Sequence, residues 1–172
     1  MMSSFVIFKG SDDAEALTEV ESFRLDVWKE ILGSEAASVR FGLDQFDYDG
    51  WHFLHIKAGH ITGSGRLLIA ESELEVPDLC SFKPYLEYMQ YPMGIMNRLV
   101  VHKDHRGNGV AHNLNQQRIS FACDRSVAEI WIEVQAQRCK PMERFGFEEI
   151  GPSLDKTIPG DWRIMCNNVS SR

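Results

Sequence analysis

The sequence has no excess of basic residues. Its 18 Lys and Arg residues are outnumbered by 25 Asp and Glu residues, which gives a formal net charge of −7. Binding to a phosphate backbone needs a clustered basic surface. We therefore expect no nucleic-acid partner, and the acidic balance is more compatible with a cationic acceptor.

Long apolar runs are also missing. No run approaches the roughly 20 apolar residues that a membrane-spanning helix needs. The first residues, Met1–Lys9, have neither the basic start nor the apolar length of a secretory signal. We expect no membrane association and a cytoplasmic location. The sequence does not determine the oligomeric state, and a homodimer is left open.

Cysteines are few, and their spacing forms no known framework. The four are Cys80, Cys123, Cys139 and Cys166. They include no C-x-x-C pair and no Cys/His cluster with zinc-ligand spacing. We expect four reduced thiols and no metal site.

The 172 residues, 44% of them hydrophobic, suffice for one domain over 1–172 with a sizeable core. Hydrophobic periodicity and turn residues predict strands at 5–8, 51–56, 61–69, 95–101, 129–134, 147–150 and 163–166. Helices are predicted at 11–33, at 110–125 and from Pro141 to Gly146. This order predicts a mixed α/β fold with six or seven strands and helices on both faces of the sheet. Trp51, Phe53 and Trp131 are expected in the core.

Two segments lack a clear period. Residues 34–50 are interpreted as a loop or a second, irregular helix. They contain Asp44, Asp47 and Asp49, which either attract a cationic acceptor or form a solvated acidic loop, the interpretation we favour. Residues 70–93 hold three of the six prolines. Such a long irregular connection is expected to shape a substrate site.

The segment Val100–Ala111 carries the clearest chemical signal. An apolar strand leads into a loop with Gly107 and Gly109, and the loop leads into a helix. Glycine allows positive φ and a close approach of backbone to ligand. The first N–H groups of a helix lack partners inside it, and the helix dipole favours an anion there. With Arg106 alongside, we favour a diphosphate site over a simple connecting turn. His102 and His105 flank it, as phosphate contacts or, as we favour, as solvated loop residues.

Arg106–Ala111 resembles the R/Q-x-x-G-x-G/A loop of the GNAT superfamily of acyl-CoA-dependent N-acyltransferases. The preceding Asn97–His102 resembles that family's fourth strand. Glu143–Phe147 resembles its E-x-x-G-F pattern, and Val134-Gln135 stands where those proteins often have Ala-Gln or Asn. The resemblance implies a GNAT-like fold from Phe5 to Cys166.

The same resemblance implies a co-substrate and its contacts. Acetyl-CoA or another acyl-CoA would be the donor, with no metal. Backbone N–H groups of Gly107, Asn108, Gly109, Val110 and Ala111 would hold its diphosphate beside Arg106. The pantetheine arm would pair along Leu99, Val100 and Val101, where an N–H would polarise the thioester carbonyl, and Gln135 would contact the arm. A small-molecule or peptide amine would attack directly.

Acid–base residues are less clear from the sequence. Glu71, expected to end the third strand, or Glu133 in the fifth could act as general base through a water. Either also fits a glutamate that faces solvent. In the family a tyrosine commonly precedes E-x-x-G-F and protonates the departing thiolate, but Met142 stands there in this chain. Cys139, a water, or a tyrosine of the 70–93 segment (Tyr85, Tyr88 or Tyr91) could supply the proton instead.

Two other functions are compatible with the sequence. Asp44-x-x-Asp47 and Gly65–Leu68 resemble features of acyl-homoserine lactone synthases and related N-acyl amino acid synthases. Those enzymes share the GNAT-like core but typically lack a loop of the Arg106–Ala111 type, so they rank second. The third alternative is an acyl-CoA-binding regulatory module without turnover.

Overall fold

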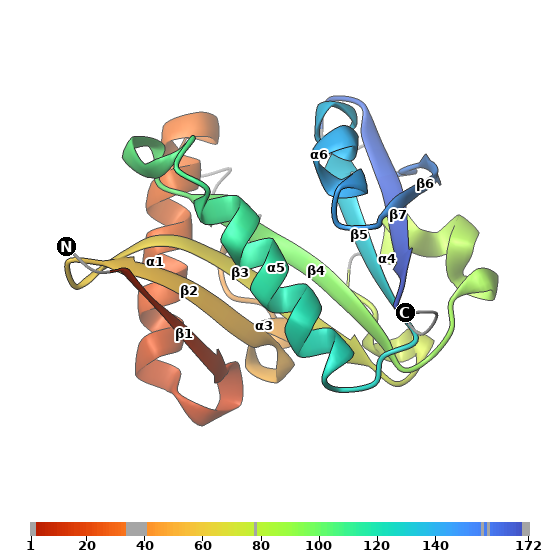
Figure 1. The fold of residues 1–172 in the computed structure, drawn as a ribbon, viewed down its shortest axis with the longest axis horizontal. Coiled ribbons are helices and arrows are strands. Elements are labelled where there is room, and N and C mark those ends of the chain that lie inside the picture. Colours follow the sequence, from red (N-terminus) through yellow and green to blue (C-terminus); the bar gives the residue numbers. More distant parts are fainter. Residues whose placement is uncertain (1–2, 34–40, 78, 156, 158, 170–172) are drawn as a thin grey trace. The chain divides into compact units, whose positions relative to one another are not determined.

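The structure, a computed structural model, describes residues 3–33, 41–77, 79–155, 157 and 159–169 (Figure 1). Its strands are β1 (Ser3–Lys9), β2 (Trp51–Lys57), β3 (His60–Ala70), β4 (Met93–Val101), β5 (Glu129–Gln135), β6 (Glu148–Pro152) and β7 (Trp162–Asn168). Its α-helices are α1 (Ala14–Leu32), α3 (Gln45–Asp49), α4 (Leu79–Phe82), α5 (Val110–Cys123) and α6 (Cys139–Glu143). Short 3-10 helices cover Gly10–Asp12, Glu73–Glu75, Lys83–Tyr88, Lys103–His105 and Ala136–Arg138.

The seven strands form a sheet with the order β1-β2-β3-β4-β5-β7-β6. The β4–β5 pair is parallel, in register from Met93 with Glu129 to Met96 with Ile132. The β1–β2, β2–β3, β5–β7 and β6–β7 pairs are antiparallel. The predicted mixed α/β fold with six or seven strands is confirmed.

The chain divides into two compact units. The first contains residues 1–68 and 98–118, and the second contains 69–97 and 119–172. The division falls within β3, β4 and α5, so that each of these elements contributes residues to both units. The expected single domain over 1–172 stays a prediction.

In the first unit, α1 and α5 lie on opposite faces of the β1–β3 strands (Figure 1). The side chain of Asp13 caps α1 by accepting from the Ala16 N–H at 2.9 Å, and the helix ends at Gly33. Leu17 and Val20 on α1 are buried. On the other face, a Cβ at Gly63 of β3 would lie 2.6 Å from the Val110 side chain of α5. The missing side chain thus lets α5 approach β3 closely.

In the second unit, β5 and β7 supply buried side chains such as Ile130, Trp131 and Ile164. The segment 70–93, which showed no period, contains α4 and two short 3-10 helices. Trp131 is buried as predicted. The same holds for Phe53 in the first unit, whereas Trp51 there is half-buried.

Of the predicted irregular region 34–50, residues 34–40 lie outside the described residues, and α3 occupies its end. The four cysteines are free in the structure, Cys80 and Cys123 exposed, Cys166 half-buried and Cys139 buried. None of the helices in the described ranges is both long and apolar enough to cross a membrane.

Candidate functional site

The loop between β4 and α5 is fixed by hydrogen bonds to β3 and to the end of β4. After β4 ends at Val101, the His102 N–H donates to the Thr62 carbonyl of β3 at 3.0 Å. The Arg106 Nε donates back to the Val101 carbonyl at 3.1 Å. These two bonds fix the exit from the strand and the start of the glycine-containing segment.

Both glycines of the loop have left-handed backbone conformations. Gly107 and Gly109 each have φ of +77°, and α5 begins at the next residue, Val110. A Cβ on either glycine would meet no atom within 4 Å. The requirement for glycine here is therefore conformational, and the surface in front of the loop is open to a ligand.

The start of α5 provides backbone donors at this surface. The Asn113 N–H donates to the Gly109 carbonyl at 2.9 Å as the first turn of the helix closes. The N–H groups of Val110 and Ala111 precede that bond, at the end of the helix dipole that attracts anions. The Arg106 side chain is exposed beside them. The predicted residues Arg106–Ala111 thus lie together at the start of α5, and their binding of an anion stays a prediction.

The end of β4 that leads into this loop is not a regular strand. Arg98 has φ of +54°, a left-handed value that is uncommon outside glycine. Leu99, Val100 and Val101 follow it, with Val100 buried and its two neighbours half-buried. A left-handed residue turns the peptide groups that come after it away from the regular ladder direction.

The remaining predicted site residues belong to the second unit. Glu133 lies half-buried on β5, and Gln135 at the end of β5 accepts from the Gln137 side chain at 3.0 Å. Glu71 is exposed and lies just after β3, which ends at Ala70. Cys139 is buried on α6. Its burial is the main reason that the pKa of its thiol is raised, and the nearby negative charge of Glu149 raises it further. Their roles toward the loop stay predictions.

The tyrosines considered as proton donors differ in their surroundings. The Tyr85 hydroxyl donates to the Pro152 carbonyl at 2.8 Å. Tyr88 is largely exposed. Within the described part of the chain, the Tyr91 hydroxyl is buried without a hydrogen-bond partner, and burial raises its pKa. Met142 is buried on α6.

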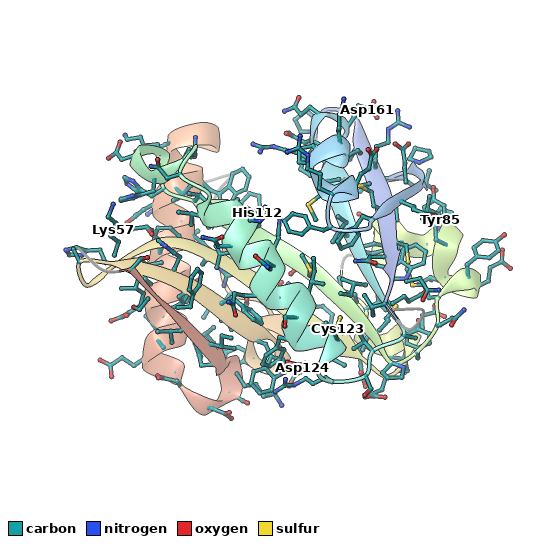
Figure 2. The ribbon with its side chains drawn as sticks, in the orientation of Figure 1. Lys57, Tyr85, His112, Cys123, Asp124 and Asp161 are labelled. Carbon is teal, nitrogen blue, oxygen red and sulfur yellow. The ribbon has the colours of Figure 1, made fainter. Side chains whose placement is uncertain are left out.

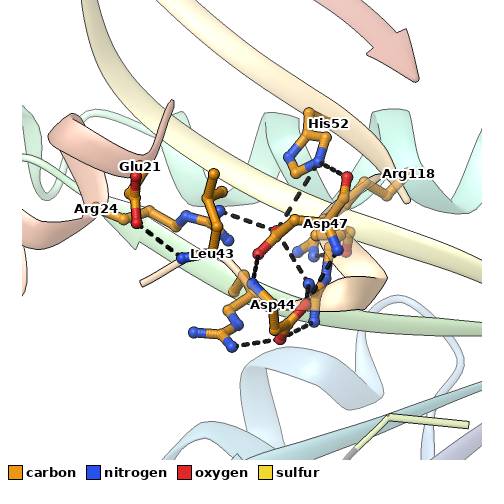
Figure 3. Close-up of polar contacts among 9 residues, drawn as sticks. Glu21, Arg24, Leu43, Asp44, Asp47, His52 and Arg118 are labelled. Atoms are coloured by element: carbon orange, nitrogen blue, oxygen red, sulfur yellow. Dashed lines mark hydrogen bonds and ion pairs between the residues drawn. The ribbon is translucent and has the colours of Figure 1, made fainter. Parts of the chain in front are cut away.

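Two acidic residues of the 41–50 segment, Asp44 and Asp47, lie in an ion-pair cluster of the first unit, shown in Figure 3. Asp47, fully buried, lies 2.9 Å from both Arg24 and Arg66. Asp44 lies 2.6 Å from Arg66 and 2.6 Å from Arg98. The favoured interpretation of a solvated acidic loop is therefore wrong for Asp44 and Asp47, because Asp47 is buried, Asp44 is half-buried, and both are paired with arginines.

The cluster also organises the backbone around it. Asp44 accepts from the Asp47 N–H, and Asp47 accepts from the Asp44 N–H, each at 3.0 Å. This reciprocal cap begins α3. The His52 Nε2 lies 2.8 Å from the Asp47 carbonyl oxygen. One short helix is thus tied to α1, β2, β3 and β4 through its first turn.

Electrostatics in the cluster follow from burial and charge. Burial alone would raise the pKa of Asp44, but Arg66 and Arg98 more than offset this and hold it at about 2. Burial lowers the pKa of His52 to about 4, despite its hydrogen bond to the Asp47 backbone. His52 is therefore neutral near pH 7, and the charges of the cluster belong to arginines and aspartates.

Sequence reasoning missed the partners of this cluster. Arg24 occurs at helical spacing among the apolar residues Leu17, Val20 and Val27. A charged residue on an otherwise apolar helix face indicates a buried ion pair. The position of Arg24 could therefore have predicted that it pairs with a buried carboxylate. Nothing in the sequence marks Arg98 as the partner of Asp44, because 54 residues separate them.

Residues 89–157 match the family described as an acetyltransferase (GNAT) domain. No curated protein gave a significant match. Among solved structures, ElaA from Escherichia coli has a TM-score of 0.71 at 16% identity, with 97% of this chain and 100% of that chain covered.

Two further solved structures share the fold. The CoA-dependent acyl-homoserine lactone synthase BjaI, solved with SAM and isopentyl-CoA, has a TM-score of 0.73 at 15% identity, covering 98% of this chain and 84% of that one. FeeM, an N-acyl amino acid synthase from uncultured soil microbes, has a TM-score of 0.69 at 11% identity, covering 98% and 92%. At these identities the likeness establishes the fold.

Proposed function

We propose that the chain is an acyl-CoA-dependent N-acyltransferase of the GNAT superfamily, as the match over residues 89–157 supports, and that Arg106–Ala111 is its donor-binding loop. The loop holds the diphosphate of acetyl-CoA or another acyl-CoA. The observation that carries this proposal is the pair of left-handed glycines, Gly107 and Gly109, directly before the first turn of α5. That geometry points backbone N–H groups at an anion without a side chain in the way.

The end of β4 supplies the second part of the donor site. The pantetheine arm pairs with Leu99, Val100 and Val101, and a backbone N–H of this stretch polarises the thioester carbonyl. The left-handed Arg98 supports this role, because it reorients the peptide groups that follow it. Gln135 contacts the arm from β5.

During acyl transfer the acceptor amine must lose one proton and the departing thiolate must gain one. The free amine of the acceptor attacks the carbonyl carbon, the carbon–sulfur bond breaks, and CoA leaves as a thiolate. The amine loses one proton, through a water held by Glu133 or Glu71, and the thiolate gains one, from Cys139 or from solvent. A thiol with a pKa of about 8.5 is a fair leaving group near neutral pH, so turnover does not require a tyrosine at Met142.

The acceptor is a small-molecule or peptide amine, and the protein works in the cytoplasm as one catalytic domain. The net charge of −7 supports a cationic acceptor. The segments 41–50 and 70–93 are the parts of the chain expected to select it, since loops carry specificity on a shared fold.

Calorimetry with acetyl-CoA tests the donor loop. Gly109→Val introduces a Cβ and strains the left-handed backbone, and Arg106→Glu adds a repelling charge. Each should weaken binding at least tenfold. Gly33→Val is the matched control and should leave acetyl-CoA affinity unchanged. Gly33 also has a left-handed backbone, with φ of +83° and no atom near a Cβ, but it lies at the C-terminal end of α1 and not in the donor loop. Affinity like that of the unaltered protein in both loop variants would sink the assignment.

A second candidate function is supported by the ion-pair cluster. Asp44, Asp47 and Arg66, the residues that resemble acyl-homoserine lactone synthases and N-acyl amino acid synthases, lie in direct contact. BjaI and FeeM share the fold. The acceptor on this alternative is SAM or an amino acid.

Product analysis separates the two candidates. Acyl-CoA and an acyl-carrier protein are each offered as donor, with SAM, amino acids and simple amines as acceptors. Formation of an acyl-homoserine lactone from SAM, or turnover only with the carrier protein, would favour the second function. Acylation of simple amines from acetyl-CoA would favour the first.

A further inference from the structure

A cavity in the first unit adjoins the donor loop and shares Asn108 and Val110 with it. Its volume is about 190 Å³, and its lining residues are Ser3, His55, Lys57, His105, Asn108 and Val110. They come from the start of β1, the end of β2, the β4–α5 loop and the first residue of α5. Ser3 and Lys57 are register partners in the β1–β2 pair. Lys57 lies at the end of the β2–β3 hairpin (Figure 2).

The cavity collects basic groups. Lys57, His55 and His105 line it, and none of the described lining residues is an aspartate or glutamate. Burial lowers the pKa of His55, and the neighbouring His105 and Lys57 lower it further. The Lys57 ammonium and the ring nitrogens of the two histidines are hydrogen-bonding groups that would stabilise an anion in the cavity.

The hydrogen bonds of His55 define the nitrogen that can serve such an anion. The Thr62 hydroxyl donates to the His55 carbonyl at 3.2 Å, and the His55 Nδ1 lies 2.5 Å from the same hydroxyl oxygen. Because that hydroxyl hydrogen is already used, Nδ1 is the donor of the second bond. Nε2 is then the nitrogen that takes up a proton when an anion arrives.

The volume of the cavity and its position beside the donor loop limit which anion can bind there. Pockets for drug-sized ligands measure about 300–1,000 Å³, so this cavity suits a single group rather than a whole nucleoside. Asn108 and Val110 belong both to the cavity and to the donor loop. A ligand with its diphosphate on the loop therefore has its next substituents within reach of the cavity. Coenzyme A carries one more phosphate on its ribose, a monoester with nearly two negative charges at pH 7.

We propose that this cavity binds the 3′-phosphate of coenzyme A, with Lys57 as the principal charged contact. The proposal rests on the proposed donor loop and extends it. It makes the protein selective for CoA over 3′-dephospho-CoA, and over donors that present phosphopantetheine on a carrier protein, which lack this phosphate.

Calorimetry with CoA and 3′-dephospho-CoA tests the assignment on the full chain. The unaltered protein should prefer CoA by about tenfold or more, the effect of one charge-assisted contact. Lys57→Ala should lower CoA affinity by about that factor and leave 3′-dephospho-CoA affinity nearly unchanged. Lys103→Ala is the matched control. Lys103 belongs to the same connection but pairs with Glu30 at 2.8 Å, so its loss should leave the CoA preference intact.

The outcomes distinguish the two proposals. Equal affinity of the unaltered protein for both ligands, or an undiminished preference in Lys57→Ala, would overturn the 3′-phosphate site while leaving the donor loop standing. Absence of binding by either ligand would overturn both. Inorganic phosphate alone should bind more than a hundredfold more weakly than CoA and compete with it. Tight binding of phosphate that does not compete with CoA would make this a free-phosphate site and refute the proposal.

Discussion

Asp44 Oδ2 and Arg98 Nη2 lie 2.6 Å apart, and this ion pair joins the residue that caps the start of α3 to the left-handed residue of β4. Arg98 also lies over the Phe41 ring, 5.7 Å from its centroid. The side chain therefore holds a strained backbone in place next to Leu99–Val101, the stretch proposed to bind the thioester.

Two substitutions of Arg98 separate the ion pair from the strain. Arg98→Ala removes the guanidinium and keeps the left-handed cost, whereas Arg98→Gly removes both. At this position Gly should be about 1 kcal/mol more stable than Ala, because only glycine adopts positive φ freely. Urea unfolding measures the difference. Within a regular strand an alanine is more stable than a glycine. If Arg98→Gly proves less stable than Arg98→Ala, the backbone at Arg98 is therefore not strained.

His52 should make stability depend on pH in mildly acidic solution. Its pKa falls from 6.5 to about 4 on folding, chiefly through burial. Between these values the unfolded chain binds a proton that the folded chain does not. The contribution of His52 to the free energy of unfolding is therefore fully present above pH 6.5. It is lost as the pH falls toward 4, and the loss amounts to about 3 kcal/mol.

The variant His52→Gln should flatten the unfolding free energy between pH 6.5 and 4. His60→Gln, on the exposed start of β3, is the control and should keep the slope. Denaturant unfolding at a series of pH values measures both. If His52→Gln retains the full slope, the titrating group lies elsewhere.

Gly10 should tolerate no side chain. A Cβ there would lie 1.9 Å from the Asp47 carbonyl oxygen, a backbone atom that cannot move away cheaply. The same carbonyl contacts His52, so the cluster would be displaced with it. Gly10→Ala should cost about 3 kcal/mol or more, measured by thermal or urea unfolding. Ser11→Ala, at the exposed neighbour, should change stability by less than about 0.5 kcal/mol.

Met142→Tyr tests how the thiolate is protonated. The variant should leave CoA affinity nearly unchanged and hold or raise kcat, because a thioether cannot donate a proton and a phenol can. Loss of one general acid typically costs about 10²–10⁴-fold, so low turnover without this tyrosine is expected.

The tyrosines of the 70–93 segment provide the contrasting result. Tyr85→Phe should cost about 1 kcal/mol of stability through its lost bond to Pro152, with little effect on kcat. Tyr88→Phe and Tyr91→Phe should leave kcat nearly unchanged. A hundredfold fall in kcat from any one of the three would place the acid in this segment and remove the need for Cys139.

Local patterns in the sequence determined much of the fold and the donor loop. Alternation and helical spacing located all seven strands and the two long helices to within a few residues, because those periods arise from local backbone geometry. Gly107 and Gly109 before an apolar helix predicted positive φ, and both have it. These features depend on residues close together in the chain, so the sequence alone is sufficient for them.

Tertiary structure decided what the acidic segment and the basic residues do. Asp44 and Asp47 appeared to be a solvated loop until folding brought Arg24, Arg66 and Arg98 to them from three distant elements. Lys57, His55 and His105 became neighbours only through the β2–β3 hairpin and the β4–α5 loop. A charge is recognised as buried or paired only from its partners in space, and sequence separation carries no information about that distance.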